Sequence, residues 1–456
     1  IMAYLNRTTK QWQDMDTAHH LHPFTNYKAL AKEGSNIIVK ADGVYLTNSD
    51  NKQFLDAMSG LWCVNVGYGR KNLAEVAYKQ MQELPYYNSF FKTATTPSIE
   101  LAQQLAEIAP NDLNHAFFSS SGSEANDTVV RMVRRYWDLK EQPKKKTFIS
   151  REYAYHGSTM AGVSLGGMTG MHEQGGLMPG FEHVMPPYWY KYGAEMTPAE
   201  FGIFTANKIE EKINEIGAEN IAAFIGEPIQ GAGGVIIPPE TYWPRVQEIC
   251  KEYDILLVVD EVICGFGRTG NWFGSDTYNI KPDIITMAKG ISSGYIPLSG
   301  IMVGKRVTDI LIEKGGDFNH GYTYSGHPVA CAVAIENLKI IREENLIENS
   351  SKTSVYLEKR MKEIAEHSLV GEVRMKSFIG AVELVKNKEK KEMFAETGVV
   401  GGICRDYCTE NGLVMRAVRD GMIFCPPLIF NNNHIDELVE KLKKSLDQTQ
   451  DHISKS

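Results

Sequence analysis

Short apolar runs alternate with amphipathic stretches between about residue 60 and residue 325. The runs are rich in β-branched or aromatic residues and are bounded by Gly, Pro or polar clusters, which predicts strands. The predicted strands are His115–Ser120, Thr147–Ser150, Ile221–Gly226, Ile255–Asp260, Asp283–Met287 and Ser299–Val303. The segments Glu124–Leu139, Phe204–Ile216 and Tyr242–Tyr253 have a helical period. Alternating strands and helices predict βαβ units and a mostly parallel sheet covered on both faces.

The pattern changes after residue 327. Pro328 to about Asn345 predicts one long helix with an apolar stripe, and further elements follow at Ser351–Glu366 (helix), Gly380–Val385, Leu413–Ala417 and Met422–Cys425 (strands), and from His434 (helix). These elements predict a smaller α+β unit. Ile37–Lys40 and Val44–Thr47 indicate a hairpin around Asp42-Gly43, which we expect to pack with that unit. The expected division is residues 1–60, 61–327 and 328–456.

Composition narrows the class of protein. The 456 residues carry a net charge of −8, which gives no basic footprint for a nucleic acid. No apolar stretch approaches the length of a membrane span, and the first thirty residues do not have the pattern of a secretory signal. The seven cysteines form no C-x-x-C pair, so we expect reduced thiols and a cytoplasmic location.

An acid and a lysine follow two successive predicted strands. Asp260 ends the buried run that begins at Ile255, and Lys289 follows the next strand, 29 positions later. Ligands of open α/β sheets bind beyond the carboxyl ends of the strands. A lysine and a carboxylate at such an edge suit a cofactor that needs a covalent amine and an acid against a protonated pyridine. Taken singly, each residue is more often a solvated lysine or a turn cap.

A glycine motif provides the main competing signal. Gly265-Phe-Gly267-Arg-Thr-Gly270 matches the dinucleotide fingerprint, which should open a helix. The residues that follow, Asn271 to Tyr278, have poor helix propensity. We therefore predict a glycine-rich loop and keep a dinucleotide-dependent oxidoreductase as the alternative from another class.

A phosphate site is better placed between the strand that ends near Ser120 and the helix that follows. Ser121-Gly122-Ser123 would offer backbone N–H groups and hydroxyls at the helix N-terminus. The same residues also fit a capping box, Ser121-x-x-Glu124, that only stabilises the helix. The run His19-His20-Leu-His22 has no second ligand cluster beside it, so we expect no metal site.

The runs VVDEVICGFGRTG (Val258–Gly270) and DIITMAKG (Asp283–Gly290) resemble the signature of class III aminotransferases. Four further runs match in the expected order: SGSEAND (Ser121–Asp127), YHG (Tyr155–Gly157), GEPIQGAGG (Gly226–Gly234) and YTYSGHP (Tyr322–Pro328). Within the class, DAMSGLWCVNVGYGR (Asp56–Arg70) and HHLHPFT (His19–Thr25) resemble ω-aminotransferases, especially those that use putrescine or other polyamines with pyruvate.

The resemblance implies the fold-type I architecture: an α/β protein whose large domain has a mostly parallel seven-stranded sheet, plus a smaller α+β domain. It implies pyridoxal 5′-phosphate as cofactor and a homodimer with active sites at the subunit interface, with pairing of dimers into tetramers left open. Among the implied cofactor residues, Lys289 would be the Schiff-base lysine and acid–base group, and Asp260 would pair with the ring nitrogen. Ser121, Gly122 and Ser123 would bind the phosphate, together with Thr323 of the partner chain. Tyr155 and Val262 would lie on the two ring faces, with Glu227 nearby.

The implied substrate residues are Trp62, Phe90, Phe91 and Ala232 in the pocket walls, and Arg416 as a mobile arginine that receives a keto acid and can pair with Glu227. The implied reaction moves an amino group from an amine, putrescine or another polyamine, to pyruvate. β-Alanine–pyruvate or taurine–pyruvate transfer, an aminomutase and a decarboxylating aminotransferase are the alternatives within the class.

Overall fold

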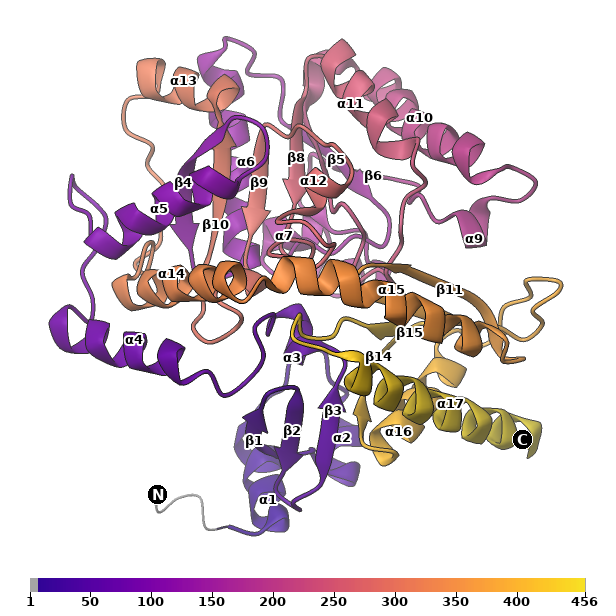
Figure 1. The fold of residues 1–456 in the computed structure, drawn as a ribbon. Coiled ribbons are helices and arrows are strands. Elements are labelled where there is room, and N and C mark those ends of the chain that lie inside the picture. Colours follow the sequence, from indigo (N-terminus) through magenta and orange to yellow (C-terminus); the bar gives the residue numbers. More distant parts are fainter. Residues whose placement is uncertain (1–6, 456) are drawn as a thin grey trace.

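A seven-stranded sheet forms the centre of the larger part of the molecule, at the top of Figure 1. The computed structural model describes residues 7–455; residues 1–6 of the predicted N-terminal segment and residue 456 lie outside the described residues. The strand order is β4 (Leu113–Ser119), β10 (Ser299–Gly304), β9 (Ile284–Met287), β8 (Leu256–Asp260), β7 (Ile221–Gly226), β5 (Thr147–Arg151) and β6 (Phe181–Val184). β10 runs in the direction opposite to the other six strands, which confirms the mostly parallel sheet. The short strand β6 was not predicted, because its four residues include an acid and a histidine.

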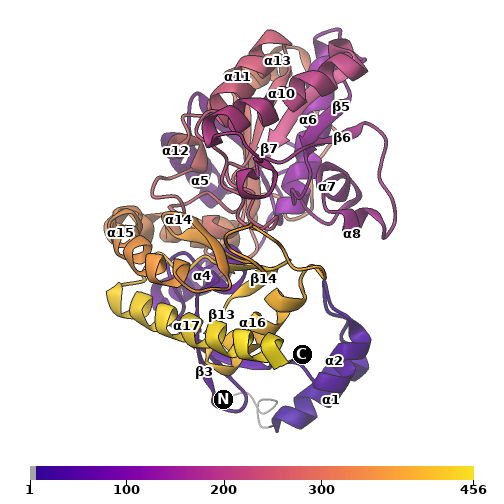
Figure 2. The same cartoon turned by 90° about the vertical axis from the view of Figure 1, so that its right-hand side faces the viewer.

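Helices cover both faces of this sheet. Figure 2 shows α10 (Pro198–Ile216) and α11 (Tyr242–Glu252) on one side and α6 (Gly122–Leu139) and α7 (Met160–Leu165) on the other. Successive strand residues point to opposite faces. Leu256 and Val258 of β8 pack in the apolar cluster of α6, whereas Leu257 and Val259 pack in the cluster of α10 and α11. Asp260 continues the first series and therefore faces α6.

Two smaller sheets form the lower part of Figure 1. One has the order β11 (Val370–Lys376), β12 (Ile379–Leu384), β15 (Gly421–Phe424) and β14 (Arg416–Val418), all antiparallel. The other has β1 (Ile38–Asp42), β2 (Tyr45–Asn48), β3 (Gln53–Asp56) and β13 (Leu413–Val414), with β3 and β13 parallel. The predicted single strand Leu413–Ala417 is wrong: buried Met415 separates two short strands that belong to different sheets.

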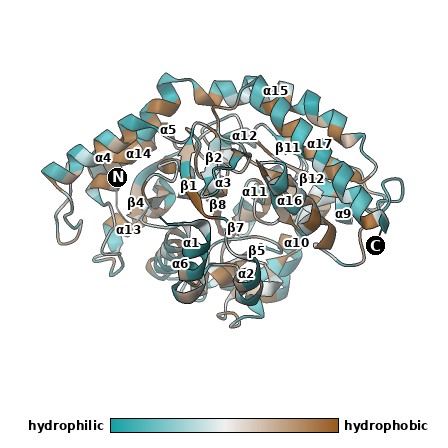
Figure 3. Cartoon of the chain, turned by 90° about the horizontal axis from the view of Figure 1, so that it is seen from below, coloured by the Kyte–Doolittle hydropathy of each residue, from teal (hydrophilic) through white to brown (hydrophobic). Residues whose placement is uncertain are grey.

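Two long helices run across the middle of the molecule (Figure 1). They are α14 (Pro328–Glu343) and α15 (Leu346–Ala365), separated at Asn345, whose φ of 51° is left-handed. The long helix predicted from Pro328 is confirmed, while α15 begins five residues before the predicted Ser351. Figure 3 shows hydrophilic and hydrophobic residues alternating along α15 and α17 (Asn432–Lys455), as expected of helices with one face on the core.

The remaining helices of eight or more residues are α1 (Thr9–His19), α4 (Lys71–Glu83), α5 (Thr96–Ile108), α13 (Lys305–Lys314) and α16 (Val399–Glu410). The shorter ones are α2 (Tyr27–Glu33), α3 (Ser59–Trp62), α8 (Thr169–His172), α9 (Trp189–Tyr192) and α12 (Gly274–Thr277). Within residues 7–455, no helix combines the length and the apolar character that a membrane span requires. We propose to keep the domain boundaries at residues 60 and 327, because α14 leads from the large sheet to the smaller ones.

Candidate active site

A cavity of about 640 Å³ lies at the carboxyl ends of three adjacent parallel strands. Asp260 is the last residue of β8, Glu227 follows β7, and Lys289 comes two residues after β9; all three line the cavity. The register of β8 and β9 pairs Asp260 with Thr286. Parallel pairing therefore turns a separation of 29 positions in the chain into a shared site, as the strand pattern predicted.

The carboxylate of Asp260 is buried and held by three donors. Nδ1 of His156 lies 2.7 Å from Oδ2, Nδ2 of Asn126 donates to the same oxygen at 3.0 Å, and the Val262 N–H donates to Oδ1 at 3.0 Å. Burial alone would raise the pKa of Asp260, but the hydrogen bonds and charge of His156, with those from Asn126 and Val262, outweigh it and lower the pKa. The site thus holds an ionised carboxylate suited to a protonated ring nitrogen.

Lys289 occupies a strained backbone position. Its φ of 48° lies in the left-handed region, which a non-glycine residue enters rarely and at a cost. The short 3₁₀ turn Lys289–Ile291 begins there, two residues after the end of β9, and Lys289 is half-buried. From this turn, Lys289 lines the cavity.

The start of α6 forms the end of the cavity that suits an anion. Ser121 is the N-cap, and its Oγ accepts from the Glu124 N–H at 3.2 Å. The Glu124 carboxylate accepts from the Ser120 N–H at 2.7 Å. A capping box would require the N–H of Ser121, so only the serine half of the predicted capping box forms. A Cβ added at Gly122 would lie 3.3 Å from a Val262 methyl group. The first N–H groups of a helix have no intrahelical partner, so this narrow cradle fits a phosphate.

Other predicted residues complete the walls. Tyr155, Val262, Trp62 and Ala232 line the cavity, and Trp62 is almost fully buried with a left-handed φ of 65°. Arg416, the first residue of β14, reaches the same cavity from the smaller part of the molecule.

Arg416 has no side-chain hydrogen bond or ion pair among the described residues; burial lowers its pKa, and its electrostatic interaction with Tyr155 only partly offsets that shift. The pair of Glu227 with Arg416 that the resemblance implies does not form. Instead, Oε1 of Glu227 accepts from the Tyr155 N–H at 3.3 Å and Oε2 accepts from the Gly231 N–H at 2.9 Å. Backbone donors thus occupy Glu227 and leave the guanidinium of Arg416 available to a ligand.

Three predicted residues do not reach this cavity within one chain. Phe90 lines a separate cavity of about 320 Å³, and Phe91 is 92% exposed. Thr323 is exposed, and its carbonyl accepts from the Tyr86 hydroxyl at 2.7 Å. A role of these residues in the same site would require a second chain.

The structure also brings in residues that the sequence analysis did not single out. His156 and Asn126 orient Asp260, and Phe24 and Cys63 line the cavity. His156 lies within the Tyr-His-Gly run, and Asn126 lies four residues after Gly122 on α6, one turn away on the same face. The Tyr-His-Gly run and the helical spacing from Gly122 are therefore the sequence signals from which His156 and Asn126 could have been predicted.

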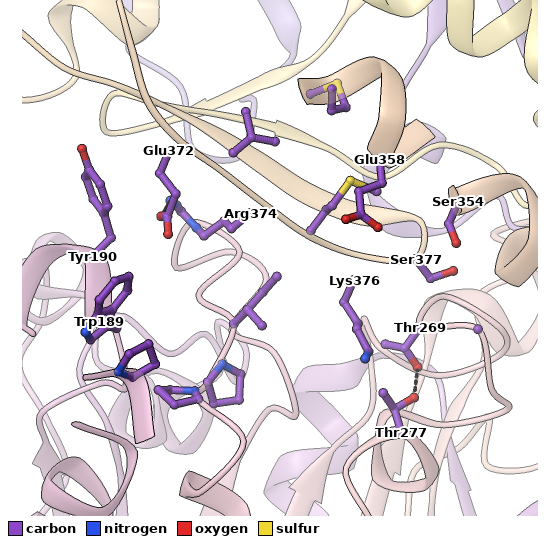
Figure 4. Close-up of a pocket in the computed structure, with 18 of the residues that line it drawn as sticks. Trp189, Tyr190, Thr269, Thr277, Ser354, Glu358, Glu372, Arg374, Lys376 and Ser377 are labelled. Carbon is purple, nitrogen blue, oxygen red and sulfur yellow. Dashed lines mark hydrogen bonds and ion pairs between the residues drawn. The ribbon is translucent and has the colours of Figure 1, made fainter. Parts of the chain in front are cut away.

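A larger cavity of about 830 Å³ lies elsewhere, between loops of the large sheet domain and the β11–α15 side of the smaller part (Figure 4). Its charged groups are largely paired, as in the 3.0 Å ion pair between Arg374 and Glu372. It contains neither Lys289 nor Asp260. The cavity of about 640 Å³, which contains Lys289 and Asp260, is therefore the candidate active site.

Comparison with known proteins agrees with this geometry. The family description Aminotransferase class-III matches residues 29–446. A putrescine–pyruvate aminotransferase of Pseudomonas aeruginosa is 56% identical over 97% of this chain and 97% of the relative.

Two solved structures have the same fold. An (S)-enantioselective ω-transaminase from Thermomicrobium roseum superposes with a TM-score of 0.95 at 42% identity, covering 97% of this chain and 99% of that one. The ω-transaminase of Pseudomonas jessenii, in complex with PMP, gives the same TM-score, identity and coverage. The matched family, the near full-length relative and the lysine–aspartate cavity together place this chain in the class III aminotransferases, which use pyridoxal 5′-phosphate.

Proposed function

We propose that this aminotransferase moves an amino group from putrescine or a related polyamine to pyruvate. The observation that carries the proposal is Arg416, whose guanidinium lines a cavity with apolar walls and makes no hydrogen bond or ion pair with the residues that the structure describes. The relative named as a putrescine–pyruvate aminotransferase, 56% identical over nearly the whole chain, supports the choice of substrates.

The cavity residues fit pyridoxal 5′-phosphate. Ser121, Gly122 and Ser123 would hold the phosphate at the start of α6, Asp260 would face the ring nitrogen, and Tyr155 and Val262 would lie on the ring faces. Lys289 would form the covalent attachment. When bound, the cofactor supplies a ring that withdraws electrons from the carbon that carries the amino group.

The chain itself has to move a proton and keep the charges in place. We assign the proton transfer to Nζ of Lys289. It would move a proton from the amine-bearing carbon to the bound cofactor in the first half-reaction, and from the cofactor to the carbon of the keto acid in the second. His156 and Asn126 keep Asp260 ionised and oriented throughout. The donor leaves as an aldehyde, and pyruvate leaves as alanine.

One cavity has to accept a donor without an α-carboxylate and an acceptor that has one. A buried carboxylate without a partner is costly, and so is a charged arginine against an apolar amine. A mobile Arg416 would meet both demands by pairing with pyruvate and withdrawing for the diamine. The apolar side chains of Trp62 and Phe24 would cover the methylene chain. Because Arg416 would also pair with the acid group of β-alanine or taurine, donors of that kind are the second candidates.

A panel of amine donors with pyruvate tests this proposal. We expect putrescine and related polyamines to give the highest kcat/KM, with β-alanine, taurine and 1-phenylethylamine below them. Alanine formation is the common measurement for all four donor types. A higher kcat/KM for β-alanine or taurine than for every diamine would exclude the polyamine assignment and leave the aminotransferase activity intact.

Arg416→Ala should separate the two half-reactions. We expect the KM for pyruvate to rise about 10- to 100-fold, the range for loss of a hydrogen bond to a charged group. The half-reaction with putrescine should change little, because a diamine has no carboxylate. Single-turnover measurements with each substrate provide the comparison, and Arg405→Ala, an exposed arginine of α16, is the control. Equal damage to both half-reactions would make Arg416 a structural residue.

We further propose a homodimer that completes the site. The exposed Phe91 and the exposed Thr323 are predicted site residues that one chain leaves outside its cavity, which supports their contribution to a partner's cavity. The unpaired state of the seven described cysteines supports a cytoplasmic location.

A mixed dimer of Lys289→Ala and Thr323→Ala chains tests the shared site. In such a dimer, the site on the Thr323→Ala chain would keep its own Lys289 and receive the intact Thr323 of its partner. That site should regain the cofactor affinity that the Thr323→Ala homodimer loses. Cofactor titration of isolated mixed dimers gives the answer, and an affinity equal to that of the Thr323→Ala homodimer would argue against sharing.

A further inference from the structure

A carboxylate and two imidazoles converge beside the N-terminal helix. Asp16 and His20 are four residues apart at the end of α1, so that their side chains lie on one face. Nδ1 of His20 lies 3.0 Å from Oδ1 of Asp16, and Nε2 of His22 lies 2.8 Å from the same oxygen. These three groups do not belong to the active-site cavity, and neither their role nor a ligand follows from the transaminase reaction.

The spacing of these atoms suits one metal ion. The three ligand atoms all lie within 4.8 Å of one another. Zn²⁺ binds imidazole nitrogen and carboxylate oxygen at about 2.0–2.2 Å, so its ligands lie roughly 3 to 3.5 Å apart in a tetrahedron. The distances from Oδ1 of Asp16 to the two imidazole nitrogens, 3.0 and 2.8 Å, are already near that value. Three protein ligands would leave the fourth coordination position for water.

The surroundings favour a cation. The Ser35 hydroxyl donates to Oδ2 of Asp16 at 2.7 Å and orients the carboxylate, as outer partners of metal ligands do. The C-terminal end of α1, where the negative end of the helix dipole lies, adds to the attraction. The side chains of His20 and His22 are 63% and 25% exposed, which gives an ion access from solvent.

We propose that Asp16, His20 and His22 form a binding site for a divalent transition-metal ion, with Zn²⁺ the best match to two imidazoles and one carboxylate. No metal site was expected here, because the sequence has no second ligand cluster beside the histidine run. Asp16, one helical turn before His20, supplies the third ligand only in the folded chain. Of the three histidines in that run, His19 lies outside the cluster.

The site would stiffen a segment that forms part of the active-site wall. Pro23 and Phe24 follow His22 directly and line the cavity, and the ring of Phe24 lies 6.3 Å from that of Tyr155. A metal that joins α1 to His22 would restrict the segment that carries Phe24. The binding test does not depend on the proposed substrates, so failure of one proposal leaves the other testable.

Titration of Zn²⁺ into the tag-free, cofactor-loaded enzyme by calorimetry tests the site. We expect one Zn²⁺ per chain at this site, and a loss of affinity of at least about tenfold in His20→Gln and in His22→Gln, since even outer partners of a metal contribute that much. His19→Gln is the matched control and should bind like the parent. Because His20 is largely exposed, its variant should fold normally, which the melting temperature without zinc would verify.

Anomalous diffraction from crystals soaked in Zn²⁺ gives an independent measurement. A peak between Asp16 and the two imidazoles, absent in His20→Gln, would support the site. Absence of zinc uptake, or uptake with the same affinity in the His20 and His22 variants as in the parent, would overturn the proposal and leave the cluster as a set of hydrogen bonds around Asp16.

Discussion

Replacement of Lys289 by alanine is expected to lower kcat at least about 10⁴-fold, the upper range for loss of a positioned acid–base group. The effect is large because one side chain would provide both the covalent attachment of the cofactor and the proton transfer. Its position supports this double role: the left-handed turn after β9 aims it into the cavity that also contains Asp260. Steady-state turnover and reduction by borohydride followed by peptide mapping are the measurements.

Lys281→Ala is the matched control, because Lys281 is exposed and precedes the same strand. It should keep both activity and cofactor attachment. An active Lys289→Ala protein with the cofactor attached to a different residue would disprove the assignment of Lys289.

Asp260→Asn is expected to slow the half-reaction with the amine about 10²- to 10³-fold, the range for loss of one preorganised electrostatic contact. The amide has nearly the same shape but no charge, so it cannot hold a proton on the ring nitrogen. Cofactor affinity should fall much less, because the phosphate cradle at the start of α6 is unchanged. Stopped-flow rates and cofactor titrations separate the two quantities.

Asp254→Asn provides the control, since Asp254 is an exposed carboxylate just before the same strand. It should react at the parent rate. Equal half-reaction rates for Asp260→Asn and the parent would rule out an electrostatic role for this carboxylate.

The lowered pKa of Asp260 adds a pH expectation. Its pKa lies below the ordinary value of 3.8, so the carboxylate stays ionised throughout the neutral and mildly acidic range. Its favourable interactions in the folded state are thus complete above pH 4 and are lost only as the pH falls through the lowered pKa. We therefore expect the ratio of the half-reaction rate of the parent to that of Asp260→Asn to stay constant between pH 7 and pH 5, which pH profiles of the two proteins would check.

Local pattern determined much of the large domain. Six of its seven strands were predicted from apolar runs bounded by turn residues, because the side chains of a strand that is buried on both faces are themselves apolar. The positions of Asp260 and Lys289 follow as well, since parallel strands place their carboxyl ends at one edge. The glycine-rich run Gly265–Gly270 was correctly predicted to start no long helix, from the poor helix propensity of the residues after it.

Only the tertiary structure decided the details that depend on distant parts of the chain. The predicted strand Leu413–Ala417 divides between two sheets because β3 pairs with its first half and β15 with its second. Glu227 binds backbone N–H groups instead of Arg416, and Asp16 joins histidines that seemed isolated in the sequence. The physical reason is the same in each case. Periodicity reports which side of an element is buried, whereas pairing and hydrogen bonds depend on which other element the fold brings against that side.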